Sequence, residues 1–204
     1  LSGSTQGIVV IDEAAKISAS GKEESPEAHP IRLAEDRTAD YMGQEFIYKC
    51  STPNSPNHIF WQDVLEGTYT HWYVPCPHCG LYFPFEFEAK KGSDLLTAGQ
   101  LEQTKTDAVT GDYRSVLWSP DARNKDGTWN EEKIRETAHY VCPHNGCRIV
   151  DMDKPKMVRA GEETHLNPNA PMSHRSFRVN SFYNLKRTFG EMALTSAPSR
   201  VRSH

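Results

Sequence analysis

An acidic pair near the start of the chain has the residue types and the setting for phosphoryl-transfer chemistry. Asp12 and Glu13 directly follow residues 8–11, which read Ile-Val-Val-Ile. Four consecutive β-branched residues are typical of a strand buried on both faces of a parallel sheet, and ligands gather at the carboxyl ends of such strands. There an aspartate can hold Mg²⁺, and an adjacent glutamate can act as general base toward water. The alternative interpretation is a strand that ends in an ordinary polar turn.

A second candidate motif, Ser51-Thr52-Pro53, ends the next predicted strand, over residues 45–50. In motor ATPases and helicases, small hydroxyl side chains at this place sense the γ-phosphate and couple hydrolysis to movement. The alternative is a common Ser-Thr-Pro turn. The motif Gly-x-x-x-x-Gly-Lys-Ser/Thr, which grips the phosphates of ATP, occurs nowhere in the 204 residues. We therefore predict that Ser51-Thr52-Pro53 and the acidic pair serve ATP hydrolysis in a longer protein that supplies the phosphate-gripping motif. This chain alone is predicted to be inactive.

Four of the five cysteines form two close pairs, Cys76 with Cys79 and Cys142 with Cys147. An odd number of cysteines without a secretion signal argues against a disulfide framework. Four thiolates complete the tetrahedral shell of Zn²⁺ and leave no open position, so we predict one structural zinc held by these four residues. The alternative is four reduced thiols without a metal.

Three side chains near these motifs could also take part in metal binding or catalysis. His78 and His144 lie inside the two cysteine turns, where each is either a substitute metal ligand or an exposed loop histidine. We favour the exposed loop histidine at both positions. Cys50 ends the second predicted strand, and we interpret it as a buried strand residue, not as a nucleophile.

The elements that must position the acidic pair alternate along the chain. We predict a strand at 8–13, a loop at 14–30, a helix at 31–42 and a second strand at 45–50. Strand, helix and strand at this spacing form a βαβ unit, which implies a parallel α/β sheet. Residues 1–70 are therefore predicted to form part of a P-loop-type ATPase sheet.

Aromatic strands flank the cysteine pairs. We predict strands at 72–74 and 81–87 around the first pair, then a polar insertion at 89–127. A helix is expected to begin after Asn130, and a further strand leads into Cys142. Together these elements predict a four-cysteine zinc ribbon inserted into the α/β fold.

The chain as a whole is predicted to have three regions. The C-terminal part of an ATPase core at 1–70 is followed by the zinc ribbon at 71–150 and by a return strand with a basic C-terminal segment at 151–204. In that last region, residues 151–174 are rich in Pro, Asn, Gly and His and indicate a loop, and 176–182 alternate like a return strand. No internal repeat is apparent.

Charge is unevenly distributed along the chain. The net charge is −4, yet residues 156–204 carry 8 Lys and Arg against 3 Asp and Glu. This basic segment is either a solvated tail or a surface that faces nucleic-acid phosphates. No run of eighteen apolar residues occurs, so no membrane-spanning helix is predicted. The candidate phosphate contacts are Arg175, Arg178, Lys186 and Arg187.

In order along the chain, these motifs resemble the GpA-type large terminase subunits of tailed phages. The resemblance implies ATP-driven translocation of double-stranded viral DNA into a procapsid, with Mg²⁺ and ATP as cofactors of the intact protein. It also implies a homo-oligomeric motor in the cytoplasm of the bacterial host, a small terminase subunit and a portal as partners, and a nuclease domain outside this chain. The matching stretches are Ile8-Val-Val-Ile-Asp12-Glu13, Pro30 to Thr38, Cys50-Ser-Thr-Pro53, Trp72 to Gly80, Tyr140 to His144 and His174 to Tyr183.

Two other classes of protein share part of this pattern. A superfamily-2 helicase has a similar acidic strand and hydroxyl turn but needs an arginine-rich second lobe, whereas residues 54–204 carry the cysteine turns instead. A zinc-ribbon module that binds nucleic acid without ATPase activity would make the acidic pair a coincidence. Strong DNA binding with no dependence on ATP would favour this second class.

Overall fold

The protein is described here by a computed structural model, which covers residues 5–17, 29–52, 55–89 and 113–196. The chain is a mixed α/β protein with two compact units, and each unit is described by itself. Unit 1 comprises Leu1–Tyr69 with Asn167–Phe177, and unit 2 comprises Thr70–Leu166 with Arg178–His204.

Unit 1 contains the predicted βαβ arrangement. Strands β1 (Ile8–Ile11) and β2 (Phe46–Lys49) pair in parallel along their whole length. Between them come α1 (Pro30–Glu35) and the 3₁₀ helix η3 (Asp36–Tyr41), in place of the single helix predicted at 31–42. The parallel pairing confirms the type of strand contact that the sequence predicts.

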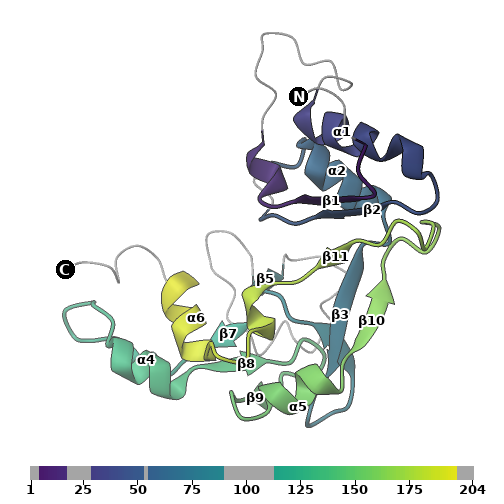
Figure 1. Ribbon diagram of the computed structural model, residues 1–204. Helices are drawn as coiled ribbons and strands as arrows, with labels where there is room; N and C mark the ends of the chain where they lie inside the picture. The colour runs from purple at the N-terminus through teal and green to yellow at the C-terminus, as the bar shows by residue number, and fades with distance from the viewer. Residues whose placement is uncertain (1–4, 18–28, 53–54, 90–112, 197–204) are drawn as a thin grey trace. The chain divides into compact units, whose positions relative to one another are not determined.

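One face of this strand pair is packed and the other is exposed. Ile11, Ile31 of α1 and Phe60 of α2 (Ile59–Glu66) are buried together, and both helices lie over the same side of β1 and β2 (Figure 1). Ile8 and Val10, by contrast, are 68% and 65% exposed. The prediction of a strand buried on both faces is therefore wrong for the described part of the chain, because the helices described there cover one side only.

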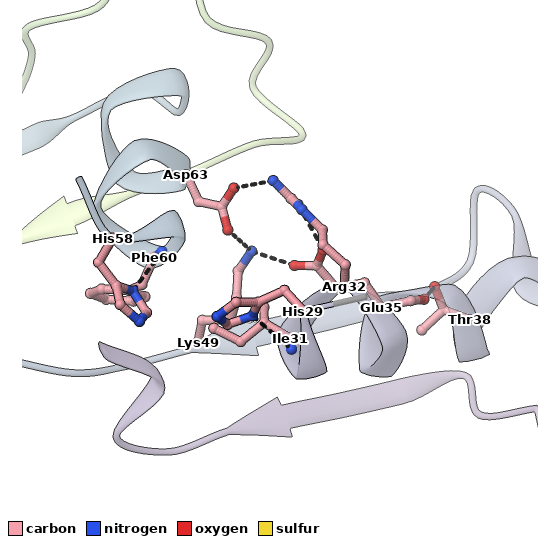
Figure 2. Close-up of polar contacts among 9 residues, drawn as sticks. All are labelled: His29, Ile31, Arg32, Glu35, Thr38, Lys49, His58, Phe60 and Asp63. Carbon is pink, nitrogen blue, oxygen red and sulfur yellow. Dashed lines mark hydrogen bonds and ion pairs between the residues drawn. The ribbon is translucent and has the colours of Figure 1, made fainter. Parts of the chain in front are cut away.

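Two histidines set the starts of the helices in unit 1 (Figure 2). Nδ1 of His58 accepts a hydrogen bond from the backbone N–H of Phe60 at 3.1 Å, and Nδ1 of His29 accepts one from Ile31 at 3.3 Å. Nε2 of His58 also lies 2.9 Å from the carbonyl oxygen of Ile17. Histidine is not among the usual N-cap residues, so the sequence pattern gives no sign that α2 begins here.

Four charged side chains tie β2 to both helices (Figure 2). The side chain of Asp63 on α2 is 5% exposed and accepts from Nζ of Lys49 at 2.6 Å and from Arg32 at 2.8 Å. Glu35 of α1 accepts from the same two cations, at 2.5 Å from Lys49 and 2.7 Å from Arg32. Because Lys49 is the last residue of β2, the network fixes the end of this strand two residues before Ser51.

Asn167 and Ser176, distant in sequence, donate hydrogen bonds to backbone carbonyls at the C-terminal end of α2. Nδ2 of Asn167 donates to the carbonyl oxygen of Gly67 at 3.1 Å, and Oγ of Ser176 donates to that of Val64 at 2.7 Å. The backbone N–H of Tyr69 donates in turn to Ser176 Oγ, also at 2.7 Å. A Cβ at position 67 would lie 2.6 Å from Ser176 Oγ, so the contact requires glycine.

Two antiparallel sheets form the centre of unit 2. In the first, β3 (Thr70–Pro75) pairs with β4 (Tyr82–Pro84) and β10 (Glu162–His165). In the second, β8 (His139–Val141) lies between β7 (Val116–Leu117) and β9 (Arg148–Ile149). Aromatic side chains fill the core between these elements, which follows from the aromatic strands in the sequence. The buried rings belong to Phe83, Phe85, Tyr140, Phe182 and Phe189.

The helices of unit 2 confirm one prediction and correct another. Helix α4 (Glu131–Thr137) begins after Asn130 as predicted, with Asn130 Oδ1 accepting from the backbone N–H of Lys133 at 3.0 Å. Residues 151–174, predicted as loop, contain α5 (Lys154–Arg159) and β10. Burial of Met157 in the aromatic core and pairing with β3 stabilise these elements, and neither contact is visible in local sequence.

The predicted return strand at 176–182 is much shorter than expected. Only Phe177–Arg178 is extended as β11, in the same sheet as β3, and a 3₁₀ turn η5 (Ser181–Tyr183) follows. Helix α6 (Phe189–Ser196), which is missing from the prediction, comes next and buries Phe189. The reciprocal hydrogen bonds between Thr188 and Glu191 form a capping box, which is the signal that could have indicated it. Of the insertion predicted at 89–127, residues 90–112 lie outside the described residues. The described part contains β6 (Tyr113–Arg114), paired with β5 (Glu88–Ala89), then β7 and η4 (Pro120–Ala122).

Candidate functional site

The two cysteine pairs lie in turns that follow the same backbone path. In the first hairpin Pro75 pairs with Tyr82, and in the second Val141 pairs with Arg148, so the two turns are equally long. The backbone N–H of Cys76 donates to the carbonyl of Leu81 at 2.9 Å, and that of Cys142 donates to Cys147 at the same distance. The structure therefore contains a local duplication that the sequence analysis misses.

Each turn closes on a glycine in the left-handed region. Gly80 has φ +75° and Gly146 has φ +64°, values that side chains rarely adopt. The N–H of Gly80 donates to the carbonyl of Cys76 at 2.9 Å, and that of Gly146 donates to Cys142 at 3.0 Å. The short motif Cys-Pro-His-x-Gly, present at both places, is the signal from which the duplication could have been found.

The four paired cysteines come together in unit 2, as predicted. Their sulfur atoms all lie within 4.8 Å of one another, and Cys79 Sγ is 3.8 Å from Cys142 Sγ. A tetrahedron with Zn–S bonds of about 2.3 Å has sulfur–sulfur edges of about 3.8 Å, so the thiols are spaced as ligands of one ion. Cys76 and Cys142 are buried and the other two are half-buried, which suits a closed structural site.

Burial makes this cluster hard to ionise without a cation. Desolvation, reinforced by the nearby thiols, raises the pKa of Cys142 to about 12 and that of Cys147 to about 11. Burial also opposes ionisation of Cys79, but hydrogen bonds from the Leu81 backbone, from neighbouring thiols and from the Asn145 side chain lower its pKa. A divalent cation would stabilise all four thiolates, so the donor set fits a thiophilic metal.

One polar contact of this cluster has no counterpart in the sequence predictions. Asn145 occupies in the second turn the place that Cys79 occupies in the first, and its side chain bonds to Cys79. The second turn supplies its other thiol two residues later, from Cys147, which explains the wider spacing of that pair. His78 and His144 are not part of the ligand cluster. His78 is exposed as predicted, whereas His144 is half-buried.

In unit 1, the parallel pairing brings the acidic pair beside the hydroxyl motif. The N–H of Ala14 donates to the carbonyl of Cys50 at 3.1 Å, and the N–H of Ala15 donates to Ser51 Oγ at 3.0 Å. Asp12 and Glu13 are both exposed, as is Thr52. Hydrogen bonds from the two residues after Glu13 therefore join the ends of β1 and β2, next to the accessible carboxylates of Asp12 and Glu13.

Glu13 holds an unusual backbone conformation at this place. Its φ is 53° and its ψ 37°, in the left-handed region that a residue other than glycine, asparagine or aspartate rarely occupies. It opens the short 3₁₀ helix η1 (Ala14–Lys16), and its carboxylate pairs with Lys16 at 3.2 Å. Strained residues of this kind concentrate at functional sites, because the surrounding structure must hold them in place.

Cys50 differs from its prediction as a buried strand residue. It is half-buried, and its Sγ donates to Oδ1 of Asp12 at 3.2 Å. This hydrogen bond to the carboxylate raises the pKa of the Cys50 thiol, so the thiol stays protonated. The Cys50 side chain faces the acidic loop and not the core, because the residue lies just past the end of β2.

The four basic candidates are divided between the two units. Arg175 belongs to unit 1, where its guanidinium lies 5.0 Å from the Phe177 ring centroid. Arg178 binds both carboxylate oxygens of Glu86 at 3.1 Å, which offsets part of its charge. Lys186 is exposed and Arg187 half-buried, and both line a groove of about 520 Å³ with residues of α4 and α6.

The described fold and site define a mixed α/β protein with an acidic strand end in one unit and a four-thiol cluster in the other. The family model described as phage terminase large subunit gpA, ATPase domain, matches residues 1–162. The chain therefore belongs to the gpA terminase ATPase-domain family, which confirms the resemblance seen in its motifs. No curated protein and no solved structure matches the chain. No helix among the described residues has the length and apolar content needed to cross a membrane.

Proposed function

We propose that the chain is part of the ATP-driven motor that packages double-stranded viral DNA into a procapsid. Its family supports this assignment, as do the carboxylates at the end of a parallel strand. The observation that carries the proposal is the hydrogen-bonded link between the acidic loop and Ser51. The motor is a homo-oligomer in the cytoplasm of the bacterial host, and its partners are a small terminase subunit and a portal.

The two carboxylates at the end of β1 have separate tasks in ATP hydrolysis. Asp12 binds the Mg²⁺ of MgATP, and Glu13 accepts a proton from the attacking water. The water oxygen bonds to the γ-phosphorus while the bond to the bridging oxygen breaks, which leaves ADP and phosphate. Bound Mg²⁺ neutralises charge on the phosphate oxygens. Both carboxylates are exposed, so the nucleotide has access to them.

Ser51 and Thr52 couple this chemistry to movement. Ser51 Oγ holds the Ala15 N–H, so a shift of the β2 end displaces the loop that carries Glu13. Lys49, two residues before Ser51, binds Asp63 of α2 and Glu35 of α1. A change at the γ-phosphate can thus pass from Ser51 through the ion network into both helices.

The thiol cluster binds one structural Zn²⁺ in the proposed motor. Cys76, Cys79, Cys142 and Cys147 supply the four ligands, because their sulfur atoms lie within 4.8 Å of one another and one pair is at 3.8 Å, the edge of a zinc tetrahedron being about 3.8 Å. Because four thiolates leave no open coordination position, the ion stabilises the ribbon and does not activate water.

The test of the proposed active site uses a longer protein that supplies the phosphate-binding loop. There Glu13→Gln is expected to lower ATP turnover at least 100-fold while MgATP binding persists, because the amide keeps the shape and removes the base. Asp12→Asn is expected to weaken Mg²⁺-dependent nucleotide binding as well. Steady-state ATPase assays and titration with a fluorescent nucleotide separate the two effects.

Glu45→Gln is the matched control, since this exposed glutamate lies at the opposite end of β2. It should leave both turnover and binding unchanged. Wild-type turnover by Glu13→Gln, or Mg²⁺-dependent ATPase activity from residues 1–204 alone, would show that the active site is placed wrongly. Tight DNA binding without any ATP dependence in the longer protein would instead favour the zinc-ribbon binding module.

The basic residues are proposed to contact DNA phosphates. Arg178 is already paired with Glu86, so Lys186 and Arg187 are the stronger contributors. Replacing these two with Ala should reduce the slope of log K against log salt by up to about 1.8, at about 0.9 per lost phosphate contact. Lys125→Ala, at an exposed lysine elsewhere in unit 2, should leave the slope unchanged. An unchanged slope for Lys186 and Arg187 would assign them to the solvated surface.

A further inference from the structure

Each cysteine turn carries a histidine that reaches across to the opposite hairpin. Nε2 of His78 lies 2.7 Å from the carbonyl oxygen of Arg148, and Nε2 of His144 lies 2.9 Å from that of Tyr82. The contacts are reciprocal, because both histidines follow a Cys-Pro pair. Tyr82 and Arg148 in turn hold equivalent positions in the strands after the turns.

These two hydrogen bonds join elements that no backbone ladder connects. The first hairpin belongs to the sheet of β3, β4 and β10, and the second to the sheet of β7, β8 and β9. The rings of Phe83 and Tyr140 stack at 5.8 Å, and the Tyr140 hydroxyl accepts from the backbone N–H of Glu86 at 3.1 Å, but neither contact lies in the cysteine turns. The histidine bonds are directional and begin one or two residues from the thiols, so they fix how the turns face each other.

The partner atoms determine the chemical role of both rings. A carbonyl oxygen only accepts hydrogen bonds, so Nε2 of each histidine carries the proton and donates it. Nε2 then has no lone pair for a metal ion, and although Nδ1 keeps one, neither histidine belongs to the ligand cluster. Each histidine is therefore committed to the opposite backbone, and its effect on the metal is through the position of the turns.

We propose that His78 and His144 form a reciprocal latch that holds the two thiol pairs at ligand distance and so slows the loss of Zn²⁺. They are positioning residues, comparable to groups that orient metal ligands from outside the coordination shell. The inference rests on the proposed zinc site. With the latch intact, one pair of thiols cannot swing away from the ion while the other pair remains bound.

The test measures Zn²⁺ release from the 204-residue protein to an excess of a chromogenic chelator. His78→Asn and His144→Asn end near the position of Nδ1 and lose the cross-hairpin donor, whereas Gln at either position places an amide N–H near Nε2. Each Asn variant should release Zn²⁺ about fivefold faster, the loss expected for one neutral hydrogen bond, and the double variant about 25-fold faster. The Gln variants should keep rates close to wild type.

Reconstitution with Co²⁺ supplies a second readout, since its visible bands report tetrahedral thiolate ligation. The bands should persist in every variant that binds the ion, because the ligands are unchanged. His174→Asn, at a histidine outside unit 2, is the control and should release Zn²⁺ at the wild-type rate. Equal rates for Asn and Gln variants would overturn the latch, as would wild-type rates in the double Asn variant. A wild-type protein that binds neither Zn²⁺ nor Co²⁺ would overturn the proposed metal site itself.

Discussion

Burial controls the protonation of single side chains in unit 2. His71 of β3 is 6% exposed, and burial, with the nearby Arg178 cation as a smaller cause, lowers its pKa from 6.5 to about 4. Its Nδ1 lies 3.9 Å from Glu86, whose own pKa is raised by burial and lowered in part by Arg178. His71 is therefore neutral in the folded protein over the whole physiological range.

This shift predicts that unit 2 loses stability as the pH falls. Between pH 6.5 and 4 the unfolded chain binds a proton at His71 and the folded chain does not, so the free energy of unfolding rises with pH there. We expect a loss of up to about 1.4 kcal/mol per pH unit below 6.5 and no contribution from His71 above pH 7.5. Urea denaturation at saturating Zn²⁺ between pH 5.5 and 7.5 measures the slope.

His71→Gln should flatten that slope, because the amide does not titrate. His174→Gln, in unit 1, should keep the wild-type pH dependence. If the wild-type and His71→Gln slopes coincide, another group is responsible for the pH dependence.

Among the elements of unit 1, the ion network takes the place of a larger apolar core. The fully buried apolar residues are few, whereas α1, β2 and α2 meet at the charges of Arg32, Glu35, Lys49 and Asp63. Removing one member of a buried ion network is more damaging than removing an exposed pair, because the remaining charge keeps its desolvation cost.

Asp63→Asn is therefore expected to destabilise unit 1 by about 2–3 kcal/mol, somewhat less than for a fully buried pair because Lys49 retains Glu35. Hydrogen exchange at the amides of β1 and β2 measures the loss within this unit. Glu66→Gln, on the exposed side of the same helix, should change the exchange by less than about 0.5 kcal/mol. Equal effects of the two changes would mean that Asp63 contributes no more than a surface charge.

In the molecule as a whole, the four-thiol cluster and the larger core belong to one unit. Cys76 and Cys142 are buried with the aromatic rings of unit 2, so the thiols are part of its packing. The acidic loop and its ion network belong to unit 1, which has its own apolar core. The stability of unit 2 should therefore depend on the metal far more than that of unit 1.

Chelation tests this difference on the intact chain. Removing Zn²⁺ should abolish exchange protection of β3, β4 and β8 and leave the amides of β1 and β2 protected. Cys142→Ser should reproduce the effect, and Cys50→Ser should not, because Cys50 lies outside the cluster. Purified protein without zinc, with all five thiols titratable under native conditions, would contradict the prediction.

The sequence by itself determined the order of the short motifs that place the chain in its family, and it predicts the chemistry that they would carry. Asp12 and Glu13 after an apolar run, the hydroxyl motif at Ser51, and the paired cysteines all depend on short-range spacing. The cap at Asn130 is equally local, since its side chain bonds a backbone N–H three residues ahead. Such signals can be recognised in a sequence because the donor and the acceptor lie within a few residues of each other.

Tertiary structure decided how these parts support one another. The start of α2 depends on an unusual capping residue, His58. Other contacts join groups far apart in sequence, as between Lys49 and Asp63 or between Asn167 and the end of α2. The histidine contacts between the cysteine turns span 62 and 70 residues, and the short α5 and β10 are stabilised by burial and strand pairing. No local pattern encodes such contacts, because they exist only once packing has brought distant backbone together.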